Sequence, residues 1–141
     1  ARYKNTGAWC AVAVRILAGT SVRVTDISIA ADVGLVINPD GVKSQLEGGA
    51  GQSCSWTLKE ELKFSNEAIT TRNWEDYPIL MFSEAPVVTV SLINQPNEPS
   101  VGAGEATQGP TAAAIGNAVH DALGVRVKQL PITMEHILAS S

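Results

Sequence analysis

The sequence predicts an α+β fold, a mostly antiparallel sheet with two principal helices, and three observations indicate it. Segments with alternating polarity and many β-branched residues, typical of strands, fill the beginning of the chain. Two longer segments, 41–60 and 110–124, carry apolar residues at helical spacing. Neither an internal repeat nor a domain linker divides the sequence, so we expect residues 1–141 to form a single α+β unit.

The first two strands are predicted at residues 7–17 and 22–34. The first contains the alternating run AVAVRI, and the second alternates less regularly. The apolar positions of the second strand are Val22, Val24, Ile27 and Ile29. The AGTS between the two segments is a turn, so we expect the strands to pair antiparallel.

The helix predicted over 41–60 follows the turn-forming cluster INPDG, and Asp40 is placed to cap its N-terminus. Apolar residues recur every four positions along it: Val42, Leu46, Ala50, Cys54 and Leu58. The helix also contains Gly48, Gly49 and Gly51, each costing about 1 kcal/mol relative to alanine. The usual reason for such glycines is the close approach of another backbone or of a ligand.

A hairpin is predicted around SNEA, with strands near 61–64 and 68–72, and a stronger strand at 86–93. Both faces of the 86–93 strand are apolar, which favours a central position in the sheet. The loop that follows, 94–109, is rich in proline and glycine. Loops of this length inside a compact domain are uncommon and often functional.

The second principal helix, 110–124, has a proline at its predicted first position and a glycine just past its end. Its predicted apolar stripe consists of Ile115, Val119, Ala122 and Leu123. A short strand is predicted at 125–131, and a terminal helical turn at 133–138 capped by Thr133.

Composition restricts the function. The chain is 45% hydrophobic and 17% charged, and the low charge indicates that part of the surface faces another subunit or domain. The net charge of −4 argues against nucleic-acid binding, and no apolar run is long enough for a membrane span. The chain does not begin with methionine, so we expect a fragment or a processed product.

Cys10 and Cys54 lack metal-site spacing and are expected to be small buried hydrophobic residues.

Glu105 lies in the glycine-rich stretch VGAGEATQGP, with no lysine or arginine between Arg72 and Arg126. Glycines let a backbone approach a ligand closely. The N-terminus of the helix that follows favours the ionised carboxylate, whereas an apolar pocket would disfavour it and raise its pKa. A carboxylate whose pKa is set by these two opposing effects suits the role of a general base. A solvated loop glutamate is the simpler alternative, and both interpretations stay open on these residues alone.

The segment KSQLEGGAG (43–51) also has two interpretations. In the first, the helix lies against a bulky ligand, and the Gln45 amide donates and accepts hydrogen bonds. In the second, its glycines allow it to pack closely on another helix or on the sheet. It is not a phosphate-binding P-loop, because no GK[ST] follows. His120 and His136 are interpreted as helix-surface or interface residues rather than ligands, and neither has the context of a catalytic triad.

Three separated segments resemble the C-terminal part of the molybdenum-binding large subunit of the xanthine oxidase family. They are DVGLVINPDGVKSQLEGG (32–49), SWTLKEEL (55–62) and GAGEATQGPTAAAIGNAVHDALGVRVKQLPIT (102–133). The family includes aldehyde oxidoreductases, carbon monoxide dehydrogenases and bacterial N-heterocycle hydroxylases. The finer likeness is to the isoquinoline 1-oxidoreductase β-subunit type, through the additional stretches DYPIL and PNEPSVGAGEATQGP. The resemblance implies that residues 1–141 are the C-terminal segment of a larger molybdopterin-binding domain.

The resemblance implies roles for three residues. Glu105 takes the place of the family's catalytic base, and Gln45 matches the glutamine that binds the molybdopterin dinucleotide. The backbone at Gly104 would approach the metal site. The implied reaction is oxidation of an aldehyde or an N-heterocycle, with water as the oxygen source. The metal is held by the pterin's dithiolene, so no side chain here is implied as a metal ligand.

The resemblance also implies a cofactor and partners. The cofactor is molybdenum with molybdopterin cytosine dinucleotide, and electrons leave through iron–sulfur clusters on a small partner subunit. The rest of the molybdenum-binding subunit would supply most of the pocket for a small-molecule substrate, so the isolated chain is expected to be inactive. The alternative is a non-catalytic fragment or split-off domain that acts as an assembly or interaction module. Cytoplasmic and periplasmic locations in a bacterium both stay open.

Overall fold

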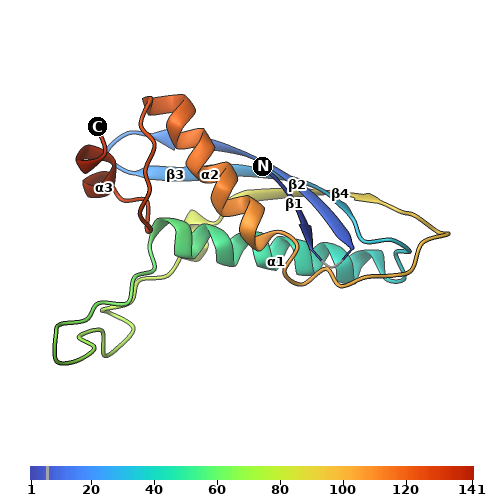
Figure 1. The fold of residues 1–141 in the computed structure, drawn as a ribbon, viewed down its shortest axis with the longest axis horizontal. Helices are drawn as coiled ribbons and strands as arrows, with labels where there is room; N and C mark the ends of the chain where they lie inside the picture. Colours follow the sequence, from blue (N-terminus) through green and yellow to red (C-terminus); the bar gives the residue numbers. More distant parts are fainter. Residues whose placement is uncertain (6) are drawn as a thin grey trace.

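The predicted α+β class is confirmed by a computed structural model, which describes residues 1–5 and 7–141 (Figure 1). In these residues the elements are β1 (Arg2–Asn5), β2 (Ala8–Ala18), β3 (Val22–Asp32), α1 (Pro39–Leu58), the 3-10 turn η1 (Phe82–Glu84), β4 (Val87–Ile93), α2 (Gln108–Leu123) and α3 (Met134–Ala139). None of the described helices is long and apolar enough to cross a membrane.

The sheet has the strand order β1-β2-β3-β4 and is mostly antiparallel, as predicted. Strands β1, β2 and β3 pair antiparallel, whereas β3 and β4 pair parallel. Helix α1 provides the crossover that a parallel pair requires. The prediction that 86–93 is a central strand is wrong, because β4 lies at the sheet edge and Val87 is 68% exposed. Its outward apolar residues are left uncovered by the described part of the chain.

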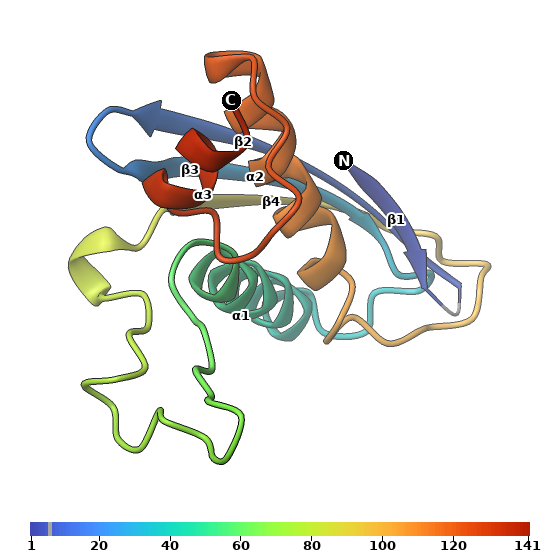
Figure 2. The same ribbon diagram turned by 60° about the vertical axis from the view of Figure 1, so that its left-hand side comes forward.

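Helices α1 and α2 pack on one face of the sheet and build the core (Figure 2). Alternate residues of β2 and β3 point into this layer, which follows from the two-residue period of a strand. The core combines Val12, Val24, Ile27 and Ile29 from the sheet with Leu46, Ala50, Cys54, Ile115 and Val119 from the helices. On the opposite face Ala11, Ala13, Ser28, Thr89 and Ser91 are exposed.

Helix α1 begins earlier than predicted and is capped by Asn38 rather than Asp40. The Asn38 side-chain oxygen accepts a hydrogen bond from the backbone N–H of Gly41 at 3.0 Å, and Pro39 takes the first helical position. Asp40 lies in the first turn, where its charge complements the helix dipole.

The chain between α1 and β4 differs most from the prediction. The expected strands near 61–64 and 68–72 reduce to a single antiparallel bridge between Phe64 and Ile69. We call residues 59–86 the arm, because they extend away from the sheet and its helices (Figure 1). A two-stranded ribbon without a third strand or a packed face is only marginally stable, which explains why no regular hairpin forms there.

The C-terminal third contains three further corrections. Helix α2 begins at Gln108, so Pro110 is its third residue, and Ala122 and Leu123 are exposed because the last turn does not pack on the core. No strand forms at 125–131, where Val127 packs irregularly against the core instead. Two predictions are confirmed: Gly124 ends α2 with φ of 72°, and the hydroxyl of Thr133 caps α3.

Both cysteines are buried and free, as predicted. Burial raises the pKa of the Cys10 thiol to about 11, and burial together with Glu84 raises that of Cys54 to about 11. The reactive thiolate is therefore scarce at pH 8, and we expect neither cysteine to react with a thiol reagent until the protein is denatured. Colorimetric thiol titration with and without denaturant tests this, and rapid labelling of the native protein would contradict it.

Candidate functional site

The loop that carries Glu105 is tied to the end of β3. The backbone N–H of Leu35 donates to Glu98 O, that of Gln95 to Gly34 O, and that of Val101 to Val33 O, at 3.0–3.2 Å. Gly34 has φ of +71°, and a Cβ built there would overlap the carbonyl oxygen of Pro99. This crossing of two backbones therefore requires glycine at position 34.

A second anchor holds the end of the loop against α1. The buried hydroxyl of Thr107 donates to the carbonyl of Leu46 at 3.0 Å, and the hydroxyl of Ser53 donates to that of Gln108 at 2.6 Å. A Cβ on Gly49 would lie 2.6 Å from Thr107 Oγ1 and 3.4 Å from Gly104 O. A close approach was expected at the glycines of α1, and at Gly49 it is the approach of the loop, through the Thr107 side chain and the Gly104 backbone. Around the neighbouring glycines of α1, 48 and 51, such a Cβ would meet no atom within 4 Å.

These two anchors bring the three candidate residues to one place, although about 60 residues separate them in sequence. A Cβ on Gly104 would lie 3.4 Å from Gln45 Oε1, so the Gln45 amide lies against the loop backbone. Glu105 follows directly in a tight turn, where the N–H of Ala106 donates to Ala103 O and that of Gln108 to Glu105 O. The structure thus places Gln45, Gly104 and Glu105 side by side.

The polar groups of this site are available for a ligand. Gln45, Gly104 and Glu105 are all exposed. Within residues 1–5 and 7–141, the hydrogen bonds and ion pairs include none from the Gln45 amide or the Glu105 carboxylate. Glu105 also lies just before the N-terminus of α2, whose dipole favours a negative charge. An unpaired carboxylate in such a position can accept a proton from a bound molecule.

The residues present fit a polar organic cofactor better than a protein-ligated metal. A free carboxamide can donate and accept hydrogen bonds, and the adjacent Gly104 lets a ligand reach the backbone. No group of three His, Cys, Asp or Glu side chains in the described part of the chain could hold a metal ion. A metal at this site would need ligands from a cofactor or another polypeptide.

The two histidines lie outside this site. His120 is exposed in the last turn of α2, in agreement with its interpretation as a helix-surface residue. His136 is partly buried in α3, and its Nδ1 lies 2.7 Å from the carbonyl oxygen of Pro131, so it is held by its own loop.

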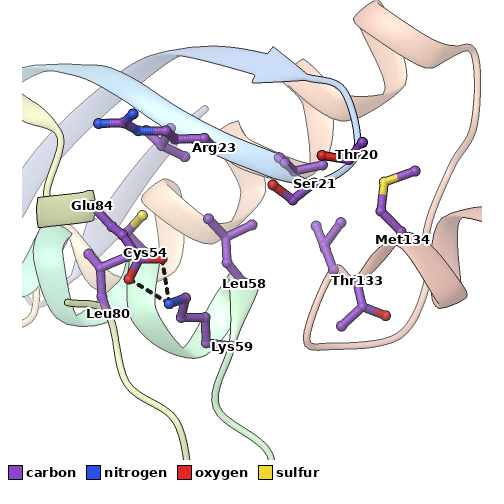
Figure 3. Close-up of a pocket in the computed structure, with 13 residues that line it drawn as sticks. Thr20, Ser21, Arg23, Cys54, Leu58, Lys59, Leu80, Glu84, Thr133 and Met134 are labelled. Carbon is purple, nitrogen blue, oxygen red and sulfur yellow. Dashed lines mark hydrogen bonds and ion pairs between the residues drawn. The ribbon is translucent and has the colours of Figure 1, made fainter.

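Sequence reasoning missed a cavity of about 390 Å³ at the other end of α1 (Figure 3). It is lined by Cys54 and Leu58 of α1, by the β2–β3 turn, by Lys59 and other residues at the base of the arm, and by the segment before α3. At about 1.5 Å per residue, Leu58 lies about 20 Å along the helix from Gln45. The cavity is assembled from distant segments, so no local pattern signals it.

The comparison with known proteins decides the family. Residues 1–86 match the family described as "Molybdopterin cofactor-binding domain". The chain belongs to this family. A nicotinate dehydrogenase subunit of Pseudomonas putida is 42% identical over 134 residues, which are 94% of this chain and 11% of that protein. The beta subunit of isoquinoline 1-oxidoreductase of Brevundimonas diminuta is 32% identical over 112 residues, 79% of this chain and 14% of that protein.

Among solved structures, quinoline 2-oxidoreductase from Pseudomonas putida 86 matches this molybdopterin-binding chain with a TM-score of 0.82 and 33% identity. The match covers 94% of this chain and 18% of that one. The resemblance to molybdenum-binding subunits of the xanthine oxidase family is therefore confirmed. The chain spans less than a fifth of the length of each of these relatives.

Two glycines of α1 provide a matched test of the second anchor. We expect Gly49→Ala to displace Thr107 and to destabilise the fold by about 1–3 kcal/mol, the usual cost of overpacking. Gly48→Ala adds the same methyl group one residue earlier in open space, and should stabilise the helix by up to about 1 kcal/mol. Urea unfolding of the two variants measures the difference. Equal effects would contradict the proposed contact between Gly49 and the loop.

Proposed function

We propose that this molybdopterin-binding chain is part of the catalytic subunit of a molybdenum hydroxylase that oxidises an N-heteroaromatic compound. The observation that carries the proposal is the grouping of Gln45, Gly104 and Glu105 on one exposed surface. Relatives at 32–42% identity are named for nicotinate, isoquinoline and quinoline, which are N-heteroaromatic compounds. An aldehyde is the alternative substrate class, since relatives named as an aldehyde dehydrogenase and an aldehyde oxidoreductase subunit are 31% and 27% identical.

Gln45 and the backbone at Gly104 would hold the cofactor, proposed as molybdopterin cytosine dinucleotide. The Gln45 amide lies beside the Gly104 backbone and makes no hydrogen bond to another described residue, so both its donor and its acceptor remain for a ligand. When bound, this cofactor supplies the two-electron redox chemistry. The protein's own contribution is to bind and orient it against the reacting groups.

Glu105 is proposed as the general base. Its carboxylate would accept a proton from the water whose oxygen enters the product, a role worth about 10²–10⁴-fold in rate. The loop is fixed by the Thr107 hydrogen bond on one side and by the Gly34 crossing on the other. Such fixed ends restrict the positions that the carboxylate can take, which is what a general base requires.

The proposed enzyme includes polypeptide beyond this chain. Residues 1–141 would be the C-terminal segment of a molybdopterin-binding domain, and the rest of the subunit would complete the substrate pocket. A small iron–sulfur subunit would carry electrons away. On this proposal the isolated chain is inactive, and activity belongs to the complete assembly.

The proposal is tested by assaying the complete enzyme on matched panels of N-heteroaromatic compounds and aldehydes in isotopically labelled water. We expect turnover of at least one heteroaromatic compound, with labelled oxygen in the hydroxylated product. Faster turnover of aldehydes would select the alternative substrate class. A purified assembly without molybdenum and pterin would instead favour the non-catalytic interaction module and overturn the proposal.

A further inference from the structure

The arm presents aromatic side chains to solvent without a core of its own. Phe82 is 99% exposed, Trp74 78% and Phe64 76%. The arm also exposes Leu62, Ile69, Ile79 and Met81. Scattered single apolar residues are normal on a protein surface, but a group of this size on one projecting segment marks an interaction site. Figures 1 and 2 both show the middle of the arm projecting from the helical layer, and its end, with η1, returning to the start of β4.

The base of the arm is fixed to the body of the fold. The backbone N–H of Leu80 donates to Ser55 Oγ of α1 at 2.9 Å, and Arg23 Nη2 of β3 donates to the carbonyl of Ser83 at 3.4 Å. Within the arm, Lys59 Nζ lies 2.6 Å from Glu84 Oε1. The Tyr77 hydroxyl donates to Glu60 Oε2 at 2.9 Å. These contacts hold the arm before a partner arrives, which lowers the entropy lost on binding.

Two cavities flank this base. The cavity of about 390 Å³ lies between the arm, the β2–β3 turn and the segment leading into α3, and Figure 3 shows Leu58, Leu80 and Met134 around it. A smaller cavity of about 210 Å³ shares Lys59 and Thr133 with it. The surface therefore offers both projecting aromatic side chains and hollows that can receive side chains of a partner.

The charge of the arm indicates what the partner looks like. Residues 59–86 contain three cationic and six acidic side chains, a net charge of −3 out of −4 for the whole chain. A second copy of this chain would place an acidic arm against a molecule that is itself acidic. A groove bordered by lysine and arginine is complementary, and complementary charge favours both specificity and the rate of association.

We propose that the arm is a docking element that inserts its aromatic side chains into a basic, apolar groove on the part of the molybdenum-binding subunit outside this chain. This inference rests on the proposed function, in which the chain is a segment of a longer subunit. The matching relatives are so much longer that more than four fifths of their length lies outside the matched region. The polypeptide of that region supplies the surface that covers the exposed side chains of the arm.

The test is site-specific photo-cross-linking in the complete enzyme, with benzoylphenylalanine placed at Phe82 and, separately, at Trp74. We expect cross-links to lysine- or arginine-containing peptides of the same subunit, outside residues 1–141. The cross-linked product should keep the mass of a single subunit on a denaturing gel. Cross-links to the iron–sulfur subunit, to a second copy or to no peptide would each overturn the proposal.

A charge-reversal pair tests the electrostatic part. Glu75→Lys in the arm should lower the cross-linking yield from position 82, because it adds a cation opposite the basic groove. Asp121→Lys on α2 makes the same change on an exposed residue outside the arm and should leave the yield unchanged. Equal yields in the two variants would overturn the basic groove. Cross-linking does not require turnover, so the two proposals can fail separately. An active enzyme without these cross-links refutes the docking of the arm alone. A cross-linked assembly without molybdenum refutes the catalytic function alone.

Discussion

Replacing Glu105 by glutamine should lower the turnover of the complete enzyme by about 10²–10⁴-fold while leaving its molybdenum content unchanged. Glutamine keeps the size of the side chain but cannot accept the proton. The Glu105 carboxylate takes part in no hydrogen bond or ion pair of the described residues, so the change removes no contact that holds the loop. Steady-state kinetics together with metal analysis of the purified variant measures both quantities.

Glu98→Gln is the matched control for this prediction. Glu98 is an exposed glutamate in the same loop, and its structural contacts pass through its backbone rather than its carboxylate. We expect the control to keep normal turnover and normal molybdenum content. Normal turnover in the Glu105→Gln variant would remove Glu105 from the mechanism, and an equal loss in both variants would indicate a general effect of charge in the loop.

Gly34→Ala should give the largest loss of stability among single methyl additions to the chain. The positive φ of this residue alone costs a non-glycine side chain about 1–2 kcal/mol. The new Cβ would in addition overlap the Pro99 carbonyl oxygen, so the loop that carries Glu105 has to move. Relief of such overpacking typically costs a further 1–3 kcal/mol or so. We therefore expect a lower midpoint of unfolding and a loss of turnover in the complete enzyme.

Gly124→Ala separates the two causes. Gly124 has nearly the same φ, +72°, but a Cβ there meets no atom within 4 Å. It should show the cost of the backbone conformation alone. Its turnover should stay normal, because the 16 residues of α2, about 24 Å of helix, separate Gly124 from the loop. Denaturant unfolding of both variants gives the comparison. A Gly34→Ala variant no less stable than Gly124→Ala would contradict the crossing of backbones at position 34.

The sequence predicted the core elements well because their apolar residues are buried within the chain itself. Strands β2 and β3 and helices α1 and α2 each place a periodic set of side chains, such as Val12, Ile27 and Leu46, against the others. The same reasoning misplaced β4 at the centre of the sheet. Two of its outward residues, Val87 and Ile93, are apolar although no described residue covers them. A sequence pattern cannot distinguish burial within a chain from burial against a partner.

The candidate site was predictable only in part. The glycines of α1 indicated a close approach, and the contact at Gly49 confirms it, but nothing in local spacing connects Gln45 with a loop about 60 residues later. Only the family resemblance joined Gln45 to Glu105. The pattern of the arm predicts a hairpin, whereas Phe64 and Trp74 are exposed to solvent and only one bridge forms between its two sides.

The most direct test of the proposed site is anomalous X-ray diffraction at the molybdenum absorption edge from crystals of the complete enzyme. We predict an anomalous peak beside the Glu105 carboxylate, with a pterin dinucleotide that contacts the Gln45 amide and the Gly104 backbone. A molybdenum peak elsewhere in the assembly, with Glu105 and Gln45 both facing solvent or protein, would contradict the proposed site.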